Sequence, residues 1–247
     1  MKLSRLLRSE DARQTLDLTL RLTQRSVSSE FKGTALGRLW SFINPLATIA
    51  IFALIFGVVF RGGVEPGRNS GINSFALWIG IGVLSWTFFS SGIMASMNAL
   101  VDNAGLLTKV YFPRQVLIYS AVLSLAVDFA FELLVLVIIA MILGGPGVLA
   151  MIPALLVVTV LVGMFAVGLG LMLSIATVYF RDLGHLWQIF NQMWMYASGV
   201  VFPLTMVNKV QNDLFDKGWQ VNGGPIPLTT ILRLNPAETY LEAFRSC

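Results

Sequence analysis

The segment NALVDNAGLLTKVYFPRQVL, residues 98–117, decides how this chain folds, because it is a short polar interruption between two long apolar runs. Apolar residues in it fall three or four positions apart and can share one helix face: Leu100, Ala104, Leu107 and Val110. The pattern predicts two membrane helices joined by a turn that presents a small amphipathic helix to a soluble partner. A simple interhelical turn is the alternative that the spacing leaves open.

Composition indicates an integral membrane protein. The chain has 247 residues, of which 56% are hydrophobic and 12% charged, whereas soluble domains carry roughly 25% charged residues. Apolar runs long enough to cross a bilayer recur along it. We therefore expect an all-α membrane protein formed by one domain, residues 1–247. Its single cysteine, Cys247, predicts neither an intrachain disulfide nor a cysteine metal cluster.

Residues 1–38 are basic and carry leucines at helical spacing. The basic residues are Lys2, Arg5, Arg8, Arg13, Arg21, Arg25, Lys32 and Arg38. This pattern predicts an amphipathic helix that lies along the membrane surface, with Arg5, Arg8 and Arg13 on it as interface residues. A solvated, partly disordered arm is the alternative.

The apolar runs predict five spans within residues 39–204, followed by a different tail. The predicted spans are 39–60, 75–97, 115–143, 148–178 and 183–204. Residues 205–247 mix charges, glycines and prolines with short apolar patches, so we expect one or two short helices there, at the outer surface. Most of the 17 Lys and Arg residues fall in segments that share a side with the N-terminus, which predicts a cytoplasmic N-terminus.

No motif for catalysis is present in the sequence. The phosphate-binding pattern GxxxxGK[ST] does not occur, no His, Cys and Glu residues have metal-ligand spacing, and the one histidine, His185, lies beside a span junction. We therefore expect no catalytic residue, no metal site and no cofactor in this chain. If it drives transport against a gradient, another chain supplies the energy.

Asp128 and Glu132 lie four residues apart within the third predicted span, so both occupy one helix face. Carboxylates at membrane depth are costly and turn toward protein, water or each other. Three interpretations remain open: a proton or cation relay, a polar wall for hydroxyl-rich cargo, and a pair of satisfied groups that hold helices together.

Aromatic residues are dense in the first two predicted spans. Phe52 and Phe56 are four residues apart on the first, and Trp86 and Phe89 lie on the second. Flat apolar rings can support the C–H faces of sugars without fixed hydrogen bonds. An interfacial aromatic belt and packing against lipid are the alternative.

Four blocks of sequence carry a resemblance to a known family. They are FKGTALGRLW (31–40) with Asn44-Pro45-Leu46, LLTKVYFPR (106–114), YFRDL (179–183), and Asn235-Pro236 with Phe244-Arg245. In this order and spacing they resemble the entry to the first span, the coupling segment, the next cytoplasmic turn and the outer segment of ABC-2 type permeases of polysaccharide exporters.

The resemblance implies a permease subunit of the bacterial inner or plasma membrane. It implies a second copy of the chain, two ATP-binding cassette subunits that bind ATP and Mg, six spans per permease and outer gate-like helices. Five spans are present, so it also implies a sixth beyond Cys247. The implied cargo is a lipid-linked glycan of the O-antigen, teichoic acid, capsule or galactan type, and no nucleic acid is involved.

The resemblance also implies roles for particular residues. The residues expected to contact the ATPase subunit are Leu106, Leu107, Lys109, Tyr111, Phe112, Pro113 and Arg114. The residues expected to line the conduit are Phe52, Phe56, Ser85, Trp86, Phe89 and Ser90. Two other functions compete with glycan export: ABC-2 export of a small hydrophobic drug or lipid, and proton-coupled secondary transport through Asp128 and Glu132.

Overall fold

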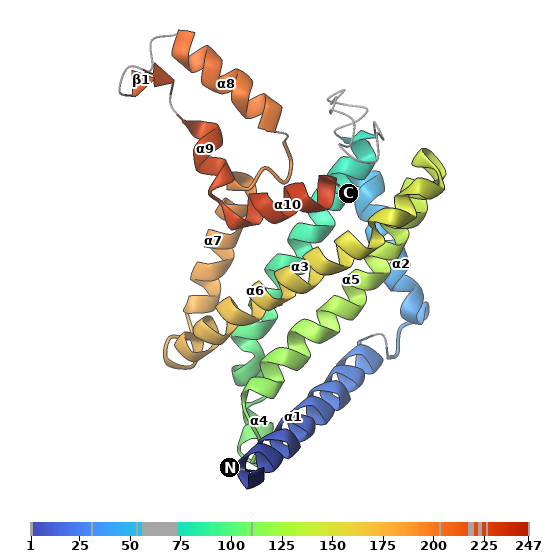
Figure 1. The fold of residues 1–247 in the computed structure, drawn as a ribbon, viewed down its shortest axis with the longest axis vertical. Helices are drawn as coiled ribbons and strands as arrows, with labels where there is room; N and C mark the ends of the chain where they lie inside the picture. Colours follow the sequence, from blue (N-terminus) through green and yellow to red (C-terminus); the bar gives the residue numbers. More distant parts are fainter. Residues whose placement is uncertain are drawn as a thin grey trace. The chain divides into compact units, whose positions relative to one another are not determined.

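A computed structural model describes most of the chain, and almost all of what it describes is helical (Figure 1). The described residues are 2–30, 32–52, 54–55, 74–109, 111–202, 204–216, 220–221, 224–225 and 227–246. The helices are α1 (Lys2–Ser29), η1 (Gly37–Leu39), α2 (Trp40–Phe52), α3 (Phe75–Asp102), α4 (Ala104–Leu107), α5 (Gln115–Gly144), η3 (Pro146–Met151), α6 (Ile152–Tyr179), α7 (Leu183–Ala197), α8 (Leu204–Asp216), α9 (Leu228–Arg233) and α10 (Pro236–Ser246).

Among the described residues, three stretches of helix are long and apolar enough to cross a membrane: α3, α5, and η3 together with α6 over Pro146–Tyr179. A bilayer core needs about 20 residues of helix. Helix α2, in the first predicted span, has 13 residues, and residues 53 and 56–60 of that prediction lie outside the described chain. The predicted number of five spans is therefore not confirmed.

The fifth predicted span was too long. Helix α7 has 15 residues and ends at Ala197 rather than at Leu204. A turn follows in which Gly199 adopts a φ of 63°, a left-handed conformation that glycine adopts without steric cost and that ends helices. Leu204 instead begins α8.

The tail contains more structure than one or two short helices. It holds α8, α9 and α10 together with a two-stranded antiparallel hairpin of β1 (Gln220–Val221) and β2 (Gly224–Pro225). In the hairpin Val221 pairs with Gly224. The hairpin is the one pair of strands among the described residues, and the expectation of helices alone missed it because two-residue strands leave no alternating pattern.

The described chain forms two compact units, each drawing on the same long helices. The first unit comprises residues 1–44, 87–133 and 159–188, and the second comprises 45–86, 134–158 and 189–247. The division falls inside α2, α3, α5, α6 and α7.

Aromatic stacking and close helix approach form the core of the first unit. The rings of Phe88 and Phe129 stack with centroids 4.5 Å apart, and α3 meets α6 where Gly170 lies against Ser96. A Cβ at Gly170 would clash with the Ser96 side chain. The absence of a side chain at this position therefore sets how closely these two helices pack.

The second unit has its core around α10 and the first turns of α3. Ala237, Leu241 and Phe244 of α10 are all buried, and Figure 1 shows α10 crossing beside the start of α3. The Trp86 ring of α3 lies edge-on to Trp194 of α7, with centroids 6.1 Å apart.

Candidate functional site

The segment between α3 and α5, residues 103–114, is the α3–α5 turn. Local hydrogen bonds build it: the Asn103 side-chain amide donates to the Ala99 carbonyl at 2.9 Å, and the Thr108 hydroxyl donates to the Gly105 carbonyl at 3.1 Å. The Pro113 carbonyl accepts the backbone N–H of Val116 at 3.1 Å, at the start of α5.

The predicted amphipathic helix in this turn is shorter than expected. Leu100 belongs to α3, α4 spans only Ala104–Leu107, and Val110 lies outside the described residues. The three-to-four spacing therefore runs across a helix end and is not the face of one helix. Asn103 lies between α3 and α4, and its side-chain amide donates to a backbone carbonyl of α3. Such bonds from Asn side chains compete with the backbone hydrogen bonds that would continue a helix.

The inner side of the turn packs on a buried cluster formed by Ala99, Leu117 and Ile118. The partly buried side chains against this cluster include Leu22, Leu106, Leu107 and Phe112. The turn therefore packs on a buried cluster at the ends of α3 and α5, and Leu22 of α1 packs on the same cluster. A force applied to it meets packed side chains, which deform little.

The outer side of the turn is open. Lys109, Pro113 and Arg114 are exposed, and Tyr111 has a relative exposure of 105%. An aromatic ring and two cations therefore project from an apolar base. Tyr and Arg are enriched in the energetically important centres of protein interfaces, so this surface can bind another protein.

Helix α1 packs on the same region through hydroxyl side chains. Thr19 and Thr23 are buried, and the Thr23 hydroxyl donates to the Thr19 carbonyl at 2.9 Å and lies 3.5 Å from the Ser120 carbonyl oxygen of α5. Leu16 and Leu20 are 62% and 50% exposed. The helix thus has a protein-facing side and an uncovered leucine side, as a helix at a membrane surface requires.

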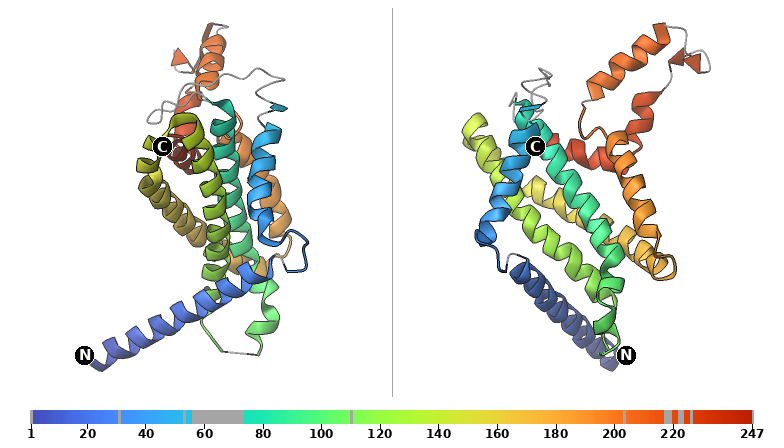
Figure 2. Two further views of the ribbon diagram at one scale, coloured as in Figure 1. Left: turned by 90° about the vertical axis from the view of Figure 1, so that its right-hand side faces the viewer. Right: turned by 180° about the vertical axis from the view of Figure 1, so that it is seen from behind.

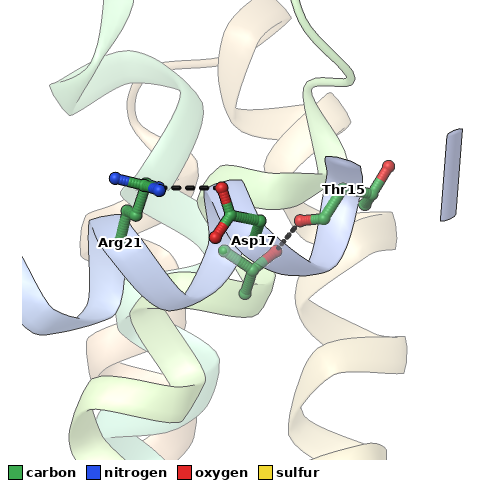
Figure 3. A network of polar contacts seen from close by, with 4 residues as sticks. Thr15, Asp17 and Arg21 are labelled. Atoms are coloured by element: carbon green, nitrogen blue, oxygen red, sulfur yellow. Dashed lines mark hydrogen bonds and ion pairs between the residues drawn. The ribbon is translucent and has the colours of Figure 1, made fainter. Parts of the chain in front are cut away.

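The polar side of α1 carries the ion pair that Figure 3 shows, between Arg21 Nε and Asp17 Oδ2 at 2.8 Å. The hydrogen bond that Arg21 donates to the Asp17 carboxylate raises the pKa of Arg21. Arg13 is exposed, while the side chains of Arg5 and Arg8 lie outside the described part. The role of these arginines as interface residues stays a prediction.

A second exposed turn joins α6 to α7. Tyr179 and Phe180 are 77% and 72% exposed, and a cavity of 390 Å³ lies among the residues from Ala176 to Leu186. His185 is exposed there. This is the YFRDL block of the sequence, and it forms a second exposed aromatic surface.

Several predicted conduit residues are buried within the chain. Ser85, Trp86 and Phe89 are 0%, 4% and 1% exposed. Ser90 and Phe52 are half-buried. Phe56 lies outside the described residues, and the conduit stays a prediction.

The two acids in α5 lie on the membrane-crossing part of the helix. Asp128 and Glu132 are both half-buried, and Asp128 lines a cavity shared with α1 and α3. Asp128 takes part in a hydrogen bond or an electrostatic interaction. The choice among relay, polar wall and helix contact stays open.

A polar network that we call the α10 clamp fastens α10 to the end of α7 through Asn235 and Arg245. The side-chain Oδ1 of Asn235 accepts the Trp194 indole N–H at 2.8 Å and the backbone N–H of Ala237 at 3.0 Å. Its amide donates to the Ser198 hydroxyl at 2.9 Å and to the Ala197 carbonyl at 3.2 Å. One side chain therefore caps α10 and holds α7.

Arg245, at the other end of α10, binds the turn after α7. Its guanidinium donates to the carbonyl oxygens of Gly199 and Val200 at 3.0 and 2.7 Å and lies 3.7 Å from the ring centroid of Trp78. Gly82 leaves room for it, since a Cβ there would meet the guanidinium. Carbonyls at a helix C-terminus carry partial negative charge, which favours a cation.

Burial shifts the pKa of the charged and phenolic groups in this clamp. It lowers the pKa of Arg245 to about 10, although the carboxylates of Glu242 and Glu238 oppose the shift. Burial of the phenol oxygen raises the pKa of Tyr240 well above its ordinary value, although the residue as a whole is half-buried. Arg245 is still protonated at neutral pH.

Sequence reasoning singled out Asn235-Pro236 and Phe244-Arg245 but missed their partners. Trp194, Ser198 and Trp78 bind them in the structure. The sequence gives little indication of these contacts, because a tryptophan in an apolar run is equally typical of the aromatic belt at a membrane interface. Only the fold brings position 235 to position 194.

Comparisons with known proteins find similar sequences. A family model described as ABC-2 type transporter matches residues 17–212. The chain is 31% identical over 191 residues to an O-antigen export system permease protein RfbA of Myxococcus xanthus, covering 77% of this chain and 70% of that protein. It is 24% identical to a protein of the same name from Klebsiella pneumoniae, covering 77% and 71%. With three membrane-length apolar helices, these matches identify a multi-pass membrane protein.

Proposed function

Because the chain belongs to the ABC-2 type transporter family, we propose that it is the permease subunit of an ATP-driven exporter of a lipid-linked polysaccharide. The relatives that it matches are named as O-antigen export permeases, and an O-antigen or galactan type of glycan is the proposed cargo. A separate ATP-binding cassette subunit provides ATP hydrolysis, and a second copy of the chain completes the pathway.

One observation carries the proposal: the α3–α5 turn is open on one side and firmly seated on the other. Tyr111 and Arg114 are exposed, whereas Phe112 packs on the buried cluster at the ends of α3 and α5. A partner that binds the exposed side therefore pushes on two helices at once. We propose that the ATPase subunit binds here and that the N-terminus lies on the same, cytoplasmic side.

Helix α1 takes part in the same transmission. Leu22 packs against the cluster that seats the turn, and Thr23 contacts α5 near Ser120. The exposed Tyr179 and Phe180 of the α6–α7 turn provide a second contact for the same partner. Two contacts on different helices resist rotation of the partner, which one contact does not.

We further propose that the glycan passes between two copies of the chain. Ser85, Trp86 and Phe89 are buried here, so they would reach the glycan only after helices move apart. This is the step that nucleotide binding to the partner is proposed to drive.

The experiment replaces exposed residues of the turn, so that folding is preserved. Arg114→Glu and Tyr111→Ala, alone and together, are expected to lower both surface glycan and the amount of ATPase subunit that co-purifies. Loss of a central interface anchor costs about 2 kcal/mol or more, or roughly 30-fold in affinity. Lys209→Glu on α8, an exposed residue, is the control and should leave both measurements unchanged.

Cargo is tested separately by depleting the protein. Accumulation of lipid-linked polymer inside the cell supports glycan export. Loss of drug resistance with normal surface glycan would support the export of small hydrophobic molecules instead. Unchanged export in the double variant at residues 111 and 114 would overturn the coupling role of the turn.

A further inference from the structure

The first unit contains a cavity of 540 Å³ between α1, the end of α3 and the first turns of α5, and Figure 2 shows these helices from two further sides. Its volume falls in the range of small-molecule sites, about 300–1,000 Å³. Residues of α5 that line it fall three or four apart from Leu117 to Asp128, so one helix face forms a long wall. We call it the α1 cavity.

Polar side chains in the α1 cavity already donate their hydrogens to backbone. The hydroxyls of Ser29, Ser120 and Ser124 donate to the carbonyls of Ser26, Leu117 and Ala121, at 2.9, 3.0 and 2.9 Å. A hydroxyl oxygen that donates can still accept. The cavity therefore presents mainly hydrogen-bond acceptors and suits a ligand rich in donors.

Asn103 adds to the acceptor character of this wall. Its amide donates to the Ala99 carbonyl at 2.9 Å, which fixes the orientation of the side chain and leaves its carbonyl oxygen as an acceptor. The cavity lining includes Asn103 and Ala99 themselves.

Charges in the cavity are mixed, with acids in excess. Glu30, Asp102 and Asp128 line it together with one cation, Arg25. Within the described part of the chain, Asp102 and Arg25 form no ion pair with each other or with other residues. Unpaired opposite charges in one cavity complement a ligand that itself carries both charges.

The floor of the cavity is apolar. Leu22, Ala95, Ala99, Leu117, Ala121 and Leu125 form it. The same cavity is lined by the charged side chains of Arg25, Glu30 and Asp102. A ligand with a charged head and a hydrocarbon chain matches both parts.

We propose that the α1 cavity binds a phospholipid whose headgroup carries a primary amine, as phosphoethanolamine does. The ammonium has three N–H donors and no acceptor, which suits Asp102, Glu30 and the serine oxygens. The phosphate pairs with Arg25, and the start of an acyl chain lies on the leucine and alanine floor. The bound lipid then joins α1 to α5 beside the α3–α5 turn.

The first test uses the purified full chain in mild detergent, with lipids added one at a time. Dioleoyl-phosphatidylethanolamine, -phosphatidylcholine and -phosphatidylglycerol are compared by native mass spectrometry and by the rise in unfolding temperature. We expect phosphatidylethanolamine to bind most tightly, phosphatidylcholine less tightly and phosphatidylglycerol least tightly. The choline headgroup lacks N–H donors, and the glycerol headgroup lacks the positive charge. Equal binding of the three lipids, or a preference for phosphatidylglycerol, overturns the proposal.

The second test changes the acids and the base of the cavity. Glu30→Gln with Asp102→Asn is expected to weaken ethanolamine-lipid binding about tenfold, as loss of charge-assisted hydrogen bonds does. Arg25→Gln should weaken the ethanolamine and choline lipids alike. Asp213→Asn on α8 removes an exposed carboxylate elsewhere and should change nothing; an equal loss in this control overturns the proposal.

A third arm asks whether the lipid chain contributes. Water-soluble phosphoethanolamine offers the same head without acyl chains, so it should fail to displace the bound lipid at matched concentration. Displacement by the soluble head would overturn the assignment to a lipid. The lipid ranking of the unmodified chain needs no variant, so it decides the matter even if a substitution prevents folding.

Discussion

Asn235 shows how one side chain can fasten two helices. It accepts from Trp194 and Ala237 and donates to Ser198 and Ala197. Asn235→Ala is therefore expected to destabilise the protein by about 2–4 kcal/mol, because each lost bond costs roughly 1 kcal/mol and buried partners are left unpaired.

The measurement is thermal unfolding in detergent. Asn208→Ala, at an exposed position on α8, is the matched control and should shift the midpoint little. Equal midpoints for the two variants would contradict the role of Asn235.

Tyr240 and Arg245 predict opposite dependences of stability on alkaline pH. The pKa of Tyr240 is raised in the folded chain, so above about pH 10 the unfolded chain loses this proton first and stability falls. The pKa of Arg245 is lowered to about 10, so the folded chain loses that proton first and stability rises. The two effects oppose each other over the same range.

Tyr240→Phe separates these effects. It removes the destabilising group, so the variant should gain stability relative to the unmodified chain between about pH 9 and about pH 11. The difference in unfolding midpoint between the two proteins, followed against pH, is the measurement. A difference that does not change with pH would show that Tyr240 ionises equally in both states.

At the scale of the element, a glycine decides how α3 packs on α6. A Cβ at Gly170 would clash with Ser96, whereas a Cβ at Gly168 meets nothing within 4 Å. Gly170→Ala should destabilise by about 1–3 kcal/mol through overpacking, and Gly168→Ala should stay within about 1 kcal/mol.

Unfolding midpoints of the two variants in the same detergent make this comparison. Since both variants change glycine to alanine in the same helix, the gain in helix propensity is the same in both. The two variants differ only in whether the new Cβ meets Ser96. A greater loss for the change at 168 would refute the contact.

The long apolar helices were predictable from sequence, but their ends were less so. The predicted span 115–143 closely matches α5, Gln115–Gly144, because Phe112-Pro113 and Gly144-Gly145-Pro146 flank the run with breakers. The run from 183 to 204 contains no proline until Pro203, so the span predicted from sequence extended past the turn at Gly199. That turn is fixed by Arg245, which lies far along the chain.

The candidate site follows the same rule. The position of the α3–α5 turn was predictable, since polar residues interrupt apolar ones there. That it shares a buried cluster with Leu22 of α1 was not, because no pattern within residues 98–117 refers to α1. Contacts between distant segments depend on packing, which periodicity does not encode.

For the whole molecule, the proposed orientation predicts which surfaces face which side. With Cys247→Ser as background, Tyr111→Cys and Asp213→Cys introduce single thiols at exposed positions. A membrane-impermeant maleimide should label residue 111 only in inside-out vesicles and residue 213 only in intact spheroplasts. Labelling of residue 111 from the outside would reverse the topology and remove the proposed contact with a cytoplasmic ATPase.

Arg245 binds oxygen atoms of the main chain, at Gly199 and Val200, and every amino acid supplies the same carbonyl. The identity of residue 200 can therefore drift through evolution without weakening this attachment. Position 82 has no such latitude, since any side chain there would occupy the space of the guanidinium. Among distant homologues, we expect variety in the receiving loop and a retained glycine on the facing helix.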